Sequence, residues 1–191
     1  MKSIEVRICS GTDRGLASAV SEMITGLSQD SEIAARDTNW VAEKMAAGHA
    51  VIALNEDQPI GFGAIHVWVE ADRETEWVSH SGICVVPAYQ GQGLSDLIID
   101  GLVNASMGEA TTRKRLDFVL TTHPKIRHSY TARGFTVAPL CTLTSRPDFW
   151  DGCRGCRLFN VCNEPDATQG HDTPVPNFRC CCEGLSKPQQ P

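Results

Sequence analysis

The segment from Val86 to Ser95 carries residues suited to binding an anionic group. It reads Val-Pro-Ala-Tyr-Gln-Gly-Gln-Gly-Leu-Ser. Gly91 and Gly93 would let the backbone approach a ligand closely, and successive N–H groups at a helix N-terminus form a nest at the positive end of the helix dipole. Both features suit a pyrophosphate. The glycine spacing matches neither the Walker phosphate loop nor the dinucleotide-binding fingerprint, so a tight structural turn between a strand and a helix is the alternative.

The hydrophobic pattern predicts the elements that would position this turn. Alternating or continuous apolar runs indicate strands at residues 3–9, 50–54, 60–69, 76–86 and 116–122, with one or two closing strands at 135–143. Helical spacing indicates helices at residues 12–27, 31–47, 94–107 and 126–133. The order strand, glycine turn, helix, strand predicts a parallel strand pair. The helix N-terminus then lies at the carboxyl end of the first strand, where phosphate-bearing ligands bind in open α/β sheets.

A second motif, Tyr130-Thr-Ala-Arg-Gly-Phe135, places a glycine at the end of a short helix and an aromatic residue at the start of a strand. Together with Gln90-Gly-Gln-Gly-Leu-Ser95 it resembles the GNAT superfamily of N-acyltransferases, which carries Gln/Arg-x-x-Gly-x-Gly/Ala and Tyr-x-x-x-Gly-Phe in this order. Ser95 departs from the Gly/Ala of the family pattern. The resemblance covers residues 1–145 and implies an α/β (α+β) fold, with a mixed, splayed central β-sheet flanked by helices.

The resemblance also implies a co-substrate, acetyl-CoA, and a place for it. The residues whose main-chain N–H groups would hold the pyrophosphate are Gln90, Gly91, Gln92, Gly93, Leu94 and Ser95. The residues that would pair with the pantetheine amides, much as an added strand does, are Ile83, Cys84 and Val85. The implied reaction is N-acetylation of a primary amine by direct attack in a ternary complex. A non-catalytic acyl-CoA-binding or metal-sensing module on the same fold is the alternative.

Acyl transfer to an amine needs a base for the ammonium proton, donors for the oxyanion and a proton for the departing thiolate. Tyr130 is the candidate proton donor, with a packing role at a helix end as its alternative. His80 is the first candidate for the base, because imidazole titrates near neutral pH. Glu76, on the same face of the predicted strand, and His66 are the other candidates, and a water relay could replace them. Cys84 is rejected as a nucleophile, since a small thiol on a central strand is typical of core packing.

Residues 146–191 differ in composition from the rest of the chain. They hold six of the nine cysteines and six of the ten prolines, which predicts a small, irregular, cysteine-rich extension that needs cross-linking. The candidate metal ligands are Cys153, Cys156, Cys162, Cys180 and Cys182, because Cys-x-x-Cys is a common metal-ligand spacing. We expect a structural zinc ion. An iron–sulfur cluster and disulfides without a metal are the alternatives.

The overall composition limits the class of partner. The chain has 191 residues, of which 41% are hydrophobic, and a net charge of −6, which argues against nucleic-acid or anionic-membrane binding. No apolar run approaches the ~18 residues of a membrane span. Charged residues at the start of the chain argue against a signal peptide. We therefore expect a soluble cytoplasmic protein that acts on a small-molecule or peptide amine. The family resemblance adds a homodimer as one possible assembly.

Overall fold

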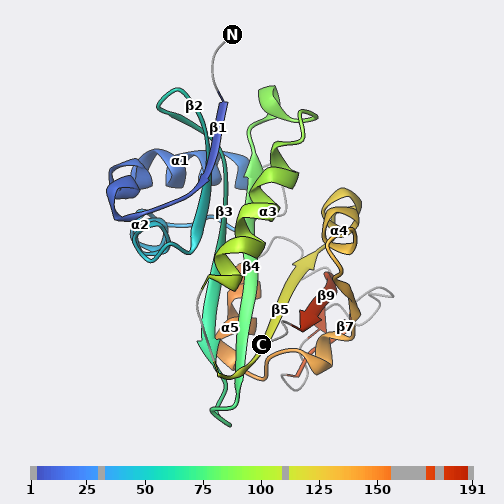
Figure 1. Cartoon of the computed structure of the whole chain (residues 1–191). Coiled ribbons are helices and arrows are strands. Elements are labelled where there is room, and N and C mark those ends of the chain that lie inside the picture. Colours follow the sequence, from blue (N-terminus) through green and yellow to red (C-terminus); the bar gives the residue numbers. More distant parts are fainter. Residues whose placement is uncertain (1–3, 30–32, 109–111, 156–170, 175–178, 189–191) are drawn as a thin grey trace. The chain divides into compact units, whose positions relative to one another are not determined.

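The computed structural model describes residues 4–29, 33–108, 112–155, 171–174 and 179–188 (Figure 1). The strands are β1 (Ile4–Ile8), β2 (Ala50–Asn55), β3 (Gln58–Val69), β4 (Thr75–Val85), β5 (Lys114–Thr121), β6 (Thr136–Ala138), β7 (His171–Asp172), β8 (Arg179–Cys180) and β9 (Glu183–Pro188). The helices are α1 (Ala17–Ser28), α2 (Thr38–Ala46), α3 (Leu94–Met107), α4 (Pro124–Thr131) and α5 (Pro147–Asp151). Short 3₁₀ turns are η1 (Gly11–Leu16), η2 (Pro87–Tyr89), η3 (Leu140–Thr142) and η4 (Gly152–Gly155).

Seven of these strands form one sheet, in the hydrogen-bonded order β1-β2-β3-β4-β5-β9-β6, and β7 pairs with β8 separately. The chain divides into two compact units. The first contains residues 1–66 and 80–110, and the second contains residues 67–79 and 111–191. Strands β3 and β4 contribute residues to both units, and each unit is described below by itself.

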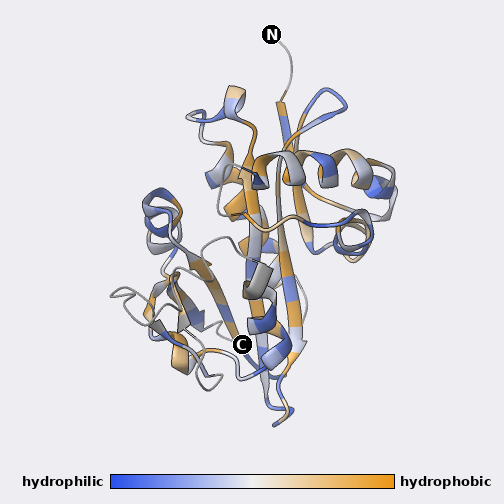
Figure 2. Cartoon of the chain, turned by 180° about the vertical axis from the view of Figure 1, so that it is seen from behind, coloured by the Kyte–Doolittle hydropathy of each residue, from blue (hydrophilic) through white to orange (hydrophobic). Residues whose placement is uncertain are grey.

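In the first unit, helices cover both faces of the sheet formed by β1, β2 and β3, whose pairs are antiparallel. Ile24 of α1 and Met45 of α2 are fully buried in one cluster with Ile52 of β2. Helix α3 packs on β1 and β2. Because successive strand residues face opposite sides, Val51 points away from that cluster, toward α3. Figure 2 shows the apolar colour concentrated on the strands, whereas the helices carry polar residues on much of their surface.

Three glycines allow α3 to approach the sheet closely. A Cβ atom on Gly63 of β3 would lie 2.8 Å from Ile98 Cγ2, and one on Gly61 would lie 3.0 Å from Ile98 Cδ1. From the helix side, a Cβ atom on Gly101 would lie 2.8 Å from Val51 Cγ2. Real Cβ atoms do not approach neighbours this closely, so the spacing between helix and sheet depends on these positions. The packing therefore fixes where the N-terminus of α3 lies.

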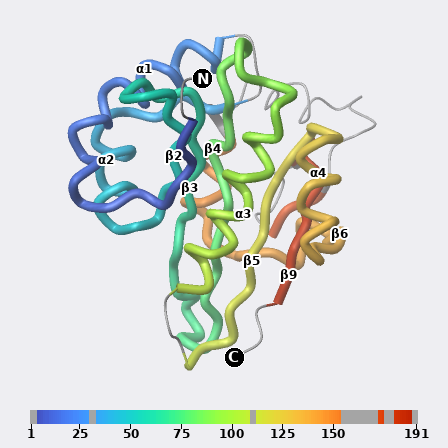
Figure 3. The backbone as a smooth tube through the Cα atoms, turned by 45° about the horizontal axis from the view of Figure 1, so that its top comes forward, coloured from blue at the N-terminus to red at the C-terminus, as the bar shows by residue number. Residues whose placement is uncertain are grey.

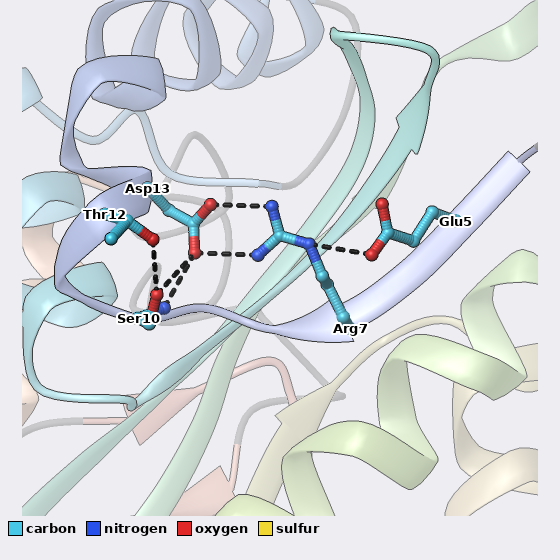
Figure 4. Close-up of polar contacts among 5 residues, drawn as sticks. All are labelled: Glu5, Arg7, Ser10, Thr12 and Asp13. Carbon is cyan, nitrogen blue, oxygen red and sulfur yellow. Dashed lines mark hydrogen bonds and ion pairs between the residues drawn. The ribbon is translucent and has the colours of Figure 1, made fainter.

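An ion pair fixes the chain where β1 leads into η1 (Figure 4). The Arg7 guanidinium donates two hydrogen bonds of 2.7 Å, one to each carboxylate oxygen of Asp13. The Ser10 N–H donates to Asp13 Oδ2 at 2.7 Å, which caps the start of η1. The hydrogen bonds from Arg7 are the main reason why the pKa of Asp13 falls from 3.8 to about 2.

In the second unit, β9 lies between β5 and β6 and is antiparallel to both (Figure 3). Leu185 of β9 is fully buried. The unit's core is aromatic. Phe118 of β5 contacts the rings of Trp68, Trp77 and Phe149 at centroid distances of 5.1 to 5.9 Å. Edge-to-face aromatic packing of this kind contributes beyond the apolar area that it buries.

The predicted fold class is confirmed, since the chain forms a mixed α+β structure whose open sheet is flanked by helices. Helix α3 has the predicted bounds. The predicted helix at 12–27 is divided into η1 and α1, and the one at 31–47 begins only at Thr38, where the Asp37 side chain caps it. The closing segment forms the short strand β6 followed by η3.

Two further expectations concern the extension and the membrane. Within residues 146–191 the described parts include α5, η4 and strand β9 of the main sheet, which the hydrophobic pattern did not predict. The boundary at residue 145 therefore remains a prediction, and it differs from the division into compact units. Among the described residues, none of the helices combines the length and apolar character that crossing a membrane requires.

Candidate functional site

The turn before α3 has the backbone geometry of an anion-binding nest. Gly91 and Gly93 have positive φ values of 77° and 79°, which glycine adopts without strain. Gly93 is the N-cap of α3, and no side chain within the described part of the chain caps the helix. Among the described residues, no hydrogen bond is made by the main-chain N–H groups of residues 91–95. These groups lie at the positive end of a 14-residue helix and can donate to a pyrophosphate.

Hydrogen bonds from several strands hold this turn in place. The Gln90 side chain donates from Nε2 to the Val85 carbonyl at 2.9 Å, so it ties the turn to the end of β4. The Val86 N–H donates to the Ile60 carbonyl of β3 at 2.9 Å. The Asn55 side chain, at the end of β2, donates to the Tyr89 hydroxyl at 2.7 Å. The first residue of the predicted signature therefore braces the loop through its side chain, and Asn55 and Tyr89 are supporting residues that the sequence did not indicate.

The three predicted pantetheine-binding residues form the last part of β4. Ile83 is partly exposed, whereas Cys84 and Val85 are buried. Burial raises the pKa of the Cys84 thiol to about 12. A thiol with this pKa stays protonated near neutral pH and is a poor nucleophile, which agrees with its rejection from the sequence.

Gly82 lies within β4 directly before these residues. Its φ is +66°, which is unusual inside a strand and which glycine adopts without strain. Gly82 was not among the predicted site residues, although an isolated glycine within a strand pattern often marks an irregular backbone.

The candidate bases lie in different surroundings. His80, on β4 in the first unit, is 2% exposed. Glu76, on the part of β4 that belongs to the second unit, is buried against Arg115, whose Nε donates to Glu76 Oε1 at 2.6 Å and whose Nη2 contacts the same oxygen. A buried carboxylate held in this way has a clear structural role. His66 is exposed and ends the first unit's part of β3.

Tyr130 lies near the end of α4 in the second unit and has no exposed surface. Its ring packs edge-to-face on Phe135 at a centroid distance of 4.8 Å. Burial, with a smaller contribution from the negative charge of Asp117, raises its pKa well above the usual value of 10. The hydroxyl therefore stays protonated at neutral pH. This state suits a proton donor, and the ring contact suits the packing alternative.

The cysteines of the extension do not form a recognisable metal site in the part that the structure describes. Within the described residues, no group of three or more His, Cys, Asp or Glu side chains could hold a metal ion. Cys153, Cys180 and Cys182 take no part in a disulfide, whereas Cys181, the middle cysteine of the run from which a ligand was expected, is disulfide-bonded. Cys156 and Cys162 lie outside the described residues. The structure therefore does not support the expected zinc ion.

Comparisons with known proteins agree with the architecture. Residues 46–137 match the family model described as an acetyltransferase (GNAT) domain. A sequence comparison with curated proteins found no significant match.

Three solved structures illustrate the similarity of fold. N-acetylglutamate synthase from Neisseria gonorrhoeae, complexed with coenzyme A and N-acetyl-glutamate, is 16% identical with a TM-score of 0.62 over 100% of this chain and 36% of that one. Diaminobutyrate acetyltransferase from Paenibacillus lautus, with its substrate and coenzyme A, is 15% identical with a TM-score of 0.55. The match covers 97% of this chain and 94% of that one. Naa50 from Arabidopsis thaliana, with a bisubstrate analogue, is 13% identical with a TM-score of 0.54. The match covers 97% of this chain and 98% of that one. The chain thus spans 36% of the length of the Neisseria protein.

Proposed function

We propose that this chain, which belongs to the GNAT acetyltransferase family, moves an acetyl group from acetyl-CoA to a primary amine by direct attack in a ternary complex. The observation that carries the proposal is the turn at residues 91–95. Its two glycines have positive φ, and its main-chain N–H groups make no hydrogen bond among the described residues. A negatively charged pyrophosphate would satisfy these donors and interact favourably with the N-terminus of α3.

The strand before the turn would take the rest of the cofactor. In this proposal the backbone of Ile83, Cys84 and Val85 pairs with the pantetheine amides, as an added strand would. The positive φ of Gly82 supports this assignment, because it departs from regular strand geometry directly before these three residues. The side chains of Gln90 and Asn55 act as braces for the loop rather than as ligands.

The chemistry assigns one role to each of two side chains. His80 accepts a proton from the ammonium form of the acceptor, so that the amine lone pair can attack the thioester carbonyl. The C–N bond forms, the C–S bond breaks, and Tyr130 donates its proton to the departing thiolate sulfur. The attacking nitrogen then loses its second proton, which returns the Tyr130 phenolate to the phenol. The raised pKa of Tyr130 supports this direction of transfer, because it keeps the phenol protonated beforehand. His80 is preferred to Glu76 because the Glu76 carboxylate is held by Arg115.

The acceptor is proposed at the level of a class. The three neighbouring structures described above were solved with N-acetyl-glutamate, with L-2,4-diaminobutyric acid and with a bisubstrate analogue that contains a peptide. The net charge of −6 is compatible with a cationic amine. We therefore propose an amine of an amino acid or of a peptide as the acceptor.

A calorimetric titration with acetyl-CoA, using adenosine as the comparison ligand, tests the cofactor assignment. Wild-type protein should bind acetyl-CoA saturably near one equivalent. Gly93→Ala should bind it about tenfold more weakly, because a left-handed backbone costs a residue with a Cβ ~1–2 kcal/mol. Gly11→Ala is the matched control, since Gly11 has open space around its Cβ position and no positive φ.

A thiol-release assay with a panel of amino acids and peptides then tests catalysis. Release of CoA that depends on the amine supports the acetyltransferase. Tight binding of acetyl-CoA without transfer to any amine would favour the non-catalytic binding module. Absence of acetyl-CoA binding would mean that residues 90–95 form only a structural turn.

A further inference from the structure

Strand β1 is an edge strand of the sheet, and in the described part of the chain it pairs only with β2. The register identifies the backbone groups that face the free edge. The Cys9 N–H donates to the Ala50 carbonyl at 2.8 Å, so residues 5, 7 and 9 occupy the hydrogen-bonded positions of the β1–β2 ladder, because bonded and non-bonded pairs alternate. The N–H and C=O groups of Ile4, Val6 and Ile8 therefore point away from β2.

The side chains of the same three residues make an apolar surface that is partly exposed. Ile4 is 36% exposed and Ile8 is 41% exposed, and Leu97 on the neighbouring helix α3 is 51% exposed. Together with Val6 and Leu94 they line a groove of about 520 Å³ between β1 and α3. An open strand edge beside exposed apolar side chains is a template for pairing with another strand.

On its opposite face β1 carries Glu5 and Arg7, and the Arg7 guanidinium also binds the Asp13 carboxylate from η1. Glu5 and Arg7 lie side by side on this face, with Glu5 Oε1 3.0 Å from Arg7 Nε (Figure 4). The strand therefore reads Ile-Glu-Val-Arg-Ile. Its isoleucines lie symmetrically about Val6, and the two residues next to Val6 carry opposite charges. A sequence of this kind is complementary to itself in the antiparallel direction.

An antiparallel pairing of two copies about Val6 would place Ile4 opposite Ile8 of the partner subunit. It would also place Glu5 opposite Arg7 of the partner subunit, at a non-hydrogen-bonded position where opposed side chains are closest. A register moved by two residues would instead oppose Glu5 with Glu5 of the partner subunit, or Arg7 with Arg7 of the partner subunit. Like charges directly opposite destabilise a strand pair, so the charges select the register centred on Val6.

We propose that β1 is the interface of a two-fold symmetric homodimer, in which the β1 strands of two copies pair antiparallel about Val6 and join their sheets edge to edge. The backbone groups of Ile4, Val6 and Ile8 form the hydrogen bonds between the copies. Their side chains continue the apolar surface from one copy to the next, and Glu5 and Arg7 fix the register. A two-fold axis makes each contact occur twice, which is the usual geometry of soluble homodimers.

Sedimentation analysis of the wild type and of single variants tests the interface. The wild type should form a dimer at micromolar concentration. Ile4→Lys and Ile8→Glu should each raise the dissociation constant at least tenfold, because each puts a charge against an isoleucine of the partner subunit at two places. Val69→Lys is the matched control, since Val69 is 37% exposed in the other unit, and it should leave dimerisation unchanged.

Mixing the two β1 variants tests the register. A pair formed by one Ile4→Lys chain and one Ile8→Glu chain opposes the new lysine with the new glutamate and keeps one Ile4–Ile8 contact. The mixture should therefore dimerise where each variant alone does not, and such recovery also proves that both variants are folded. A monomeric wild type, a dimer insensitive to both variants, or a mixture that stays monomeric would each overturn the proposal.

Discussion

The side-chain amide of Asn55 donates a hydrogen bond of 2.7 Å to the hydroxyl of Tyr89, which joins the end of β2 to the residue before the glycine turn. Asn55 is 8% exposed, and its Oδ1 atom is buried with no hydrogen-bond partner among the described residues. The Asn55 side-chain amide therefore depends on the Tyr89 hydroxyl as the acceptor of its hydrogen bond. The position of the turn is thus set by a residue 34 positions earlier in the chain.

Tyr89→Phe should lower the free energy of unfolding and weaken acetyl-CoA binding together. The substitution keeps the ring but leaves the buried Asn55 amide without its acceptor, which costs ~1–3 kcal/mol. Chemical denaturation and calorimetric titration measure the two effects. An unchanged affinity for acetyl-CoA, despite the loss of stability, would show that the turn does not depend on this brace.

Gly101→Ala should destabilise the protein although alanine favours helices. The new Cβ would lie 2.8 Å from Val51 Cγ2, and crowding of this kind in a packed core costs ~1–3 kcal/mol. Gly26→Ala in α1 is the matched control, because its Cβ meets open space and it should stabilise the helix by up to ~1 kcal/mol. Denaturant melts of the two variants should therefore shift in opposite directions.

Local features of the sequence predicted the part of the structure that depends on local interactions. The apolar spacing of residues 94–107 matches α3 because one face of the helix packs on the sheet, and the two glycines before it do adopt positive φ. Strand β9 was missed because Glu183–Pro188 shows no clear alternation of apolar and polar residues. Its place in the sheet depends on pairing with β5, which lies far away in the sequence.

The supporting residues of the candidate site were missed for the same reason. Asn55 looks like an ordinary turn residue until the fold brings it to Tyr89. Glu76 looked like a possible base because nothing near it in the sequence indicates Arg115, 39 positions away. The number and spacing of the cysteines suggested a metal site. In the part of the chain that the structure describes, one cysteine is in a disulfide and no group of side chains could hold a metal ion.

Glu76→Gln should act on stability rather than on a single catalytic step. Arg115 is 4% exposed, and removing the negative charge beside a buried guanidinium typically costs ~3–5 kcal/mol. The double variant Glu76→Gln with Arg115→Met should be less destabilised than Glu76→Gln alone. If Glu76→Gln keeps its stability but loses acetyl transfer, Glu76 rather than His80 is the base.

Tyr130→Phe should lower kcat by ~10²-fold or more while the fold is retained. The ring contact with Phe135 is preserved, and the hydroxyl that would donate the proton is removed. Because burial raises the pKa of Tyr130 well above 10, the wild-type rate should show no loss from its ionisation at pH 9 or below. Steady-state kinetics over this pH range, with a melting curve for each protein, make the test. An unchanged kcat would leave Tyr130 with the packing role alone.

Asp13 should make stability depend on pH in the acid range. Its folded-state pKa is lowered to about 2 by the Arg7 hydrogen bonds, against 3.8 in the unfolded chain. A lowered pKa stabilises the folded state above the unfolded value, so this contribution, about 2 kcal/mol, is fully present at neutral pH and is lost as the pH falls from about 4 to about 2. Denaturation of wild type and Asp13→Asn should therefore differ at pH 7 and converge toward pH 2. Asp57→Asn, in the exposed β2–β3 turn, is the control for removing a surface carboxylate. A difference between Asp13→Asn and wild type that stays constant down to pH 2 would mean that the Arg7–Asp13 pair contributes nothing through ionisation.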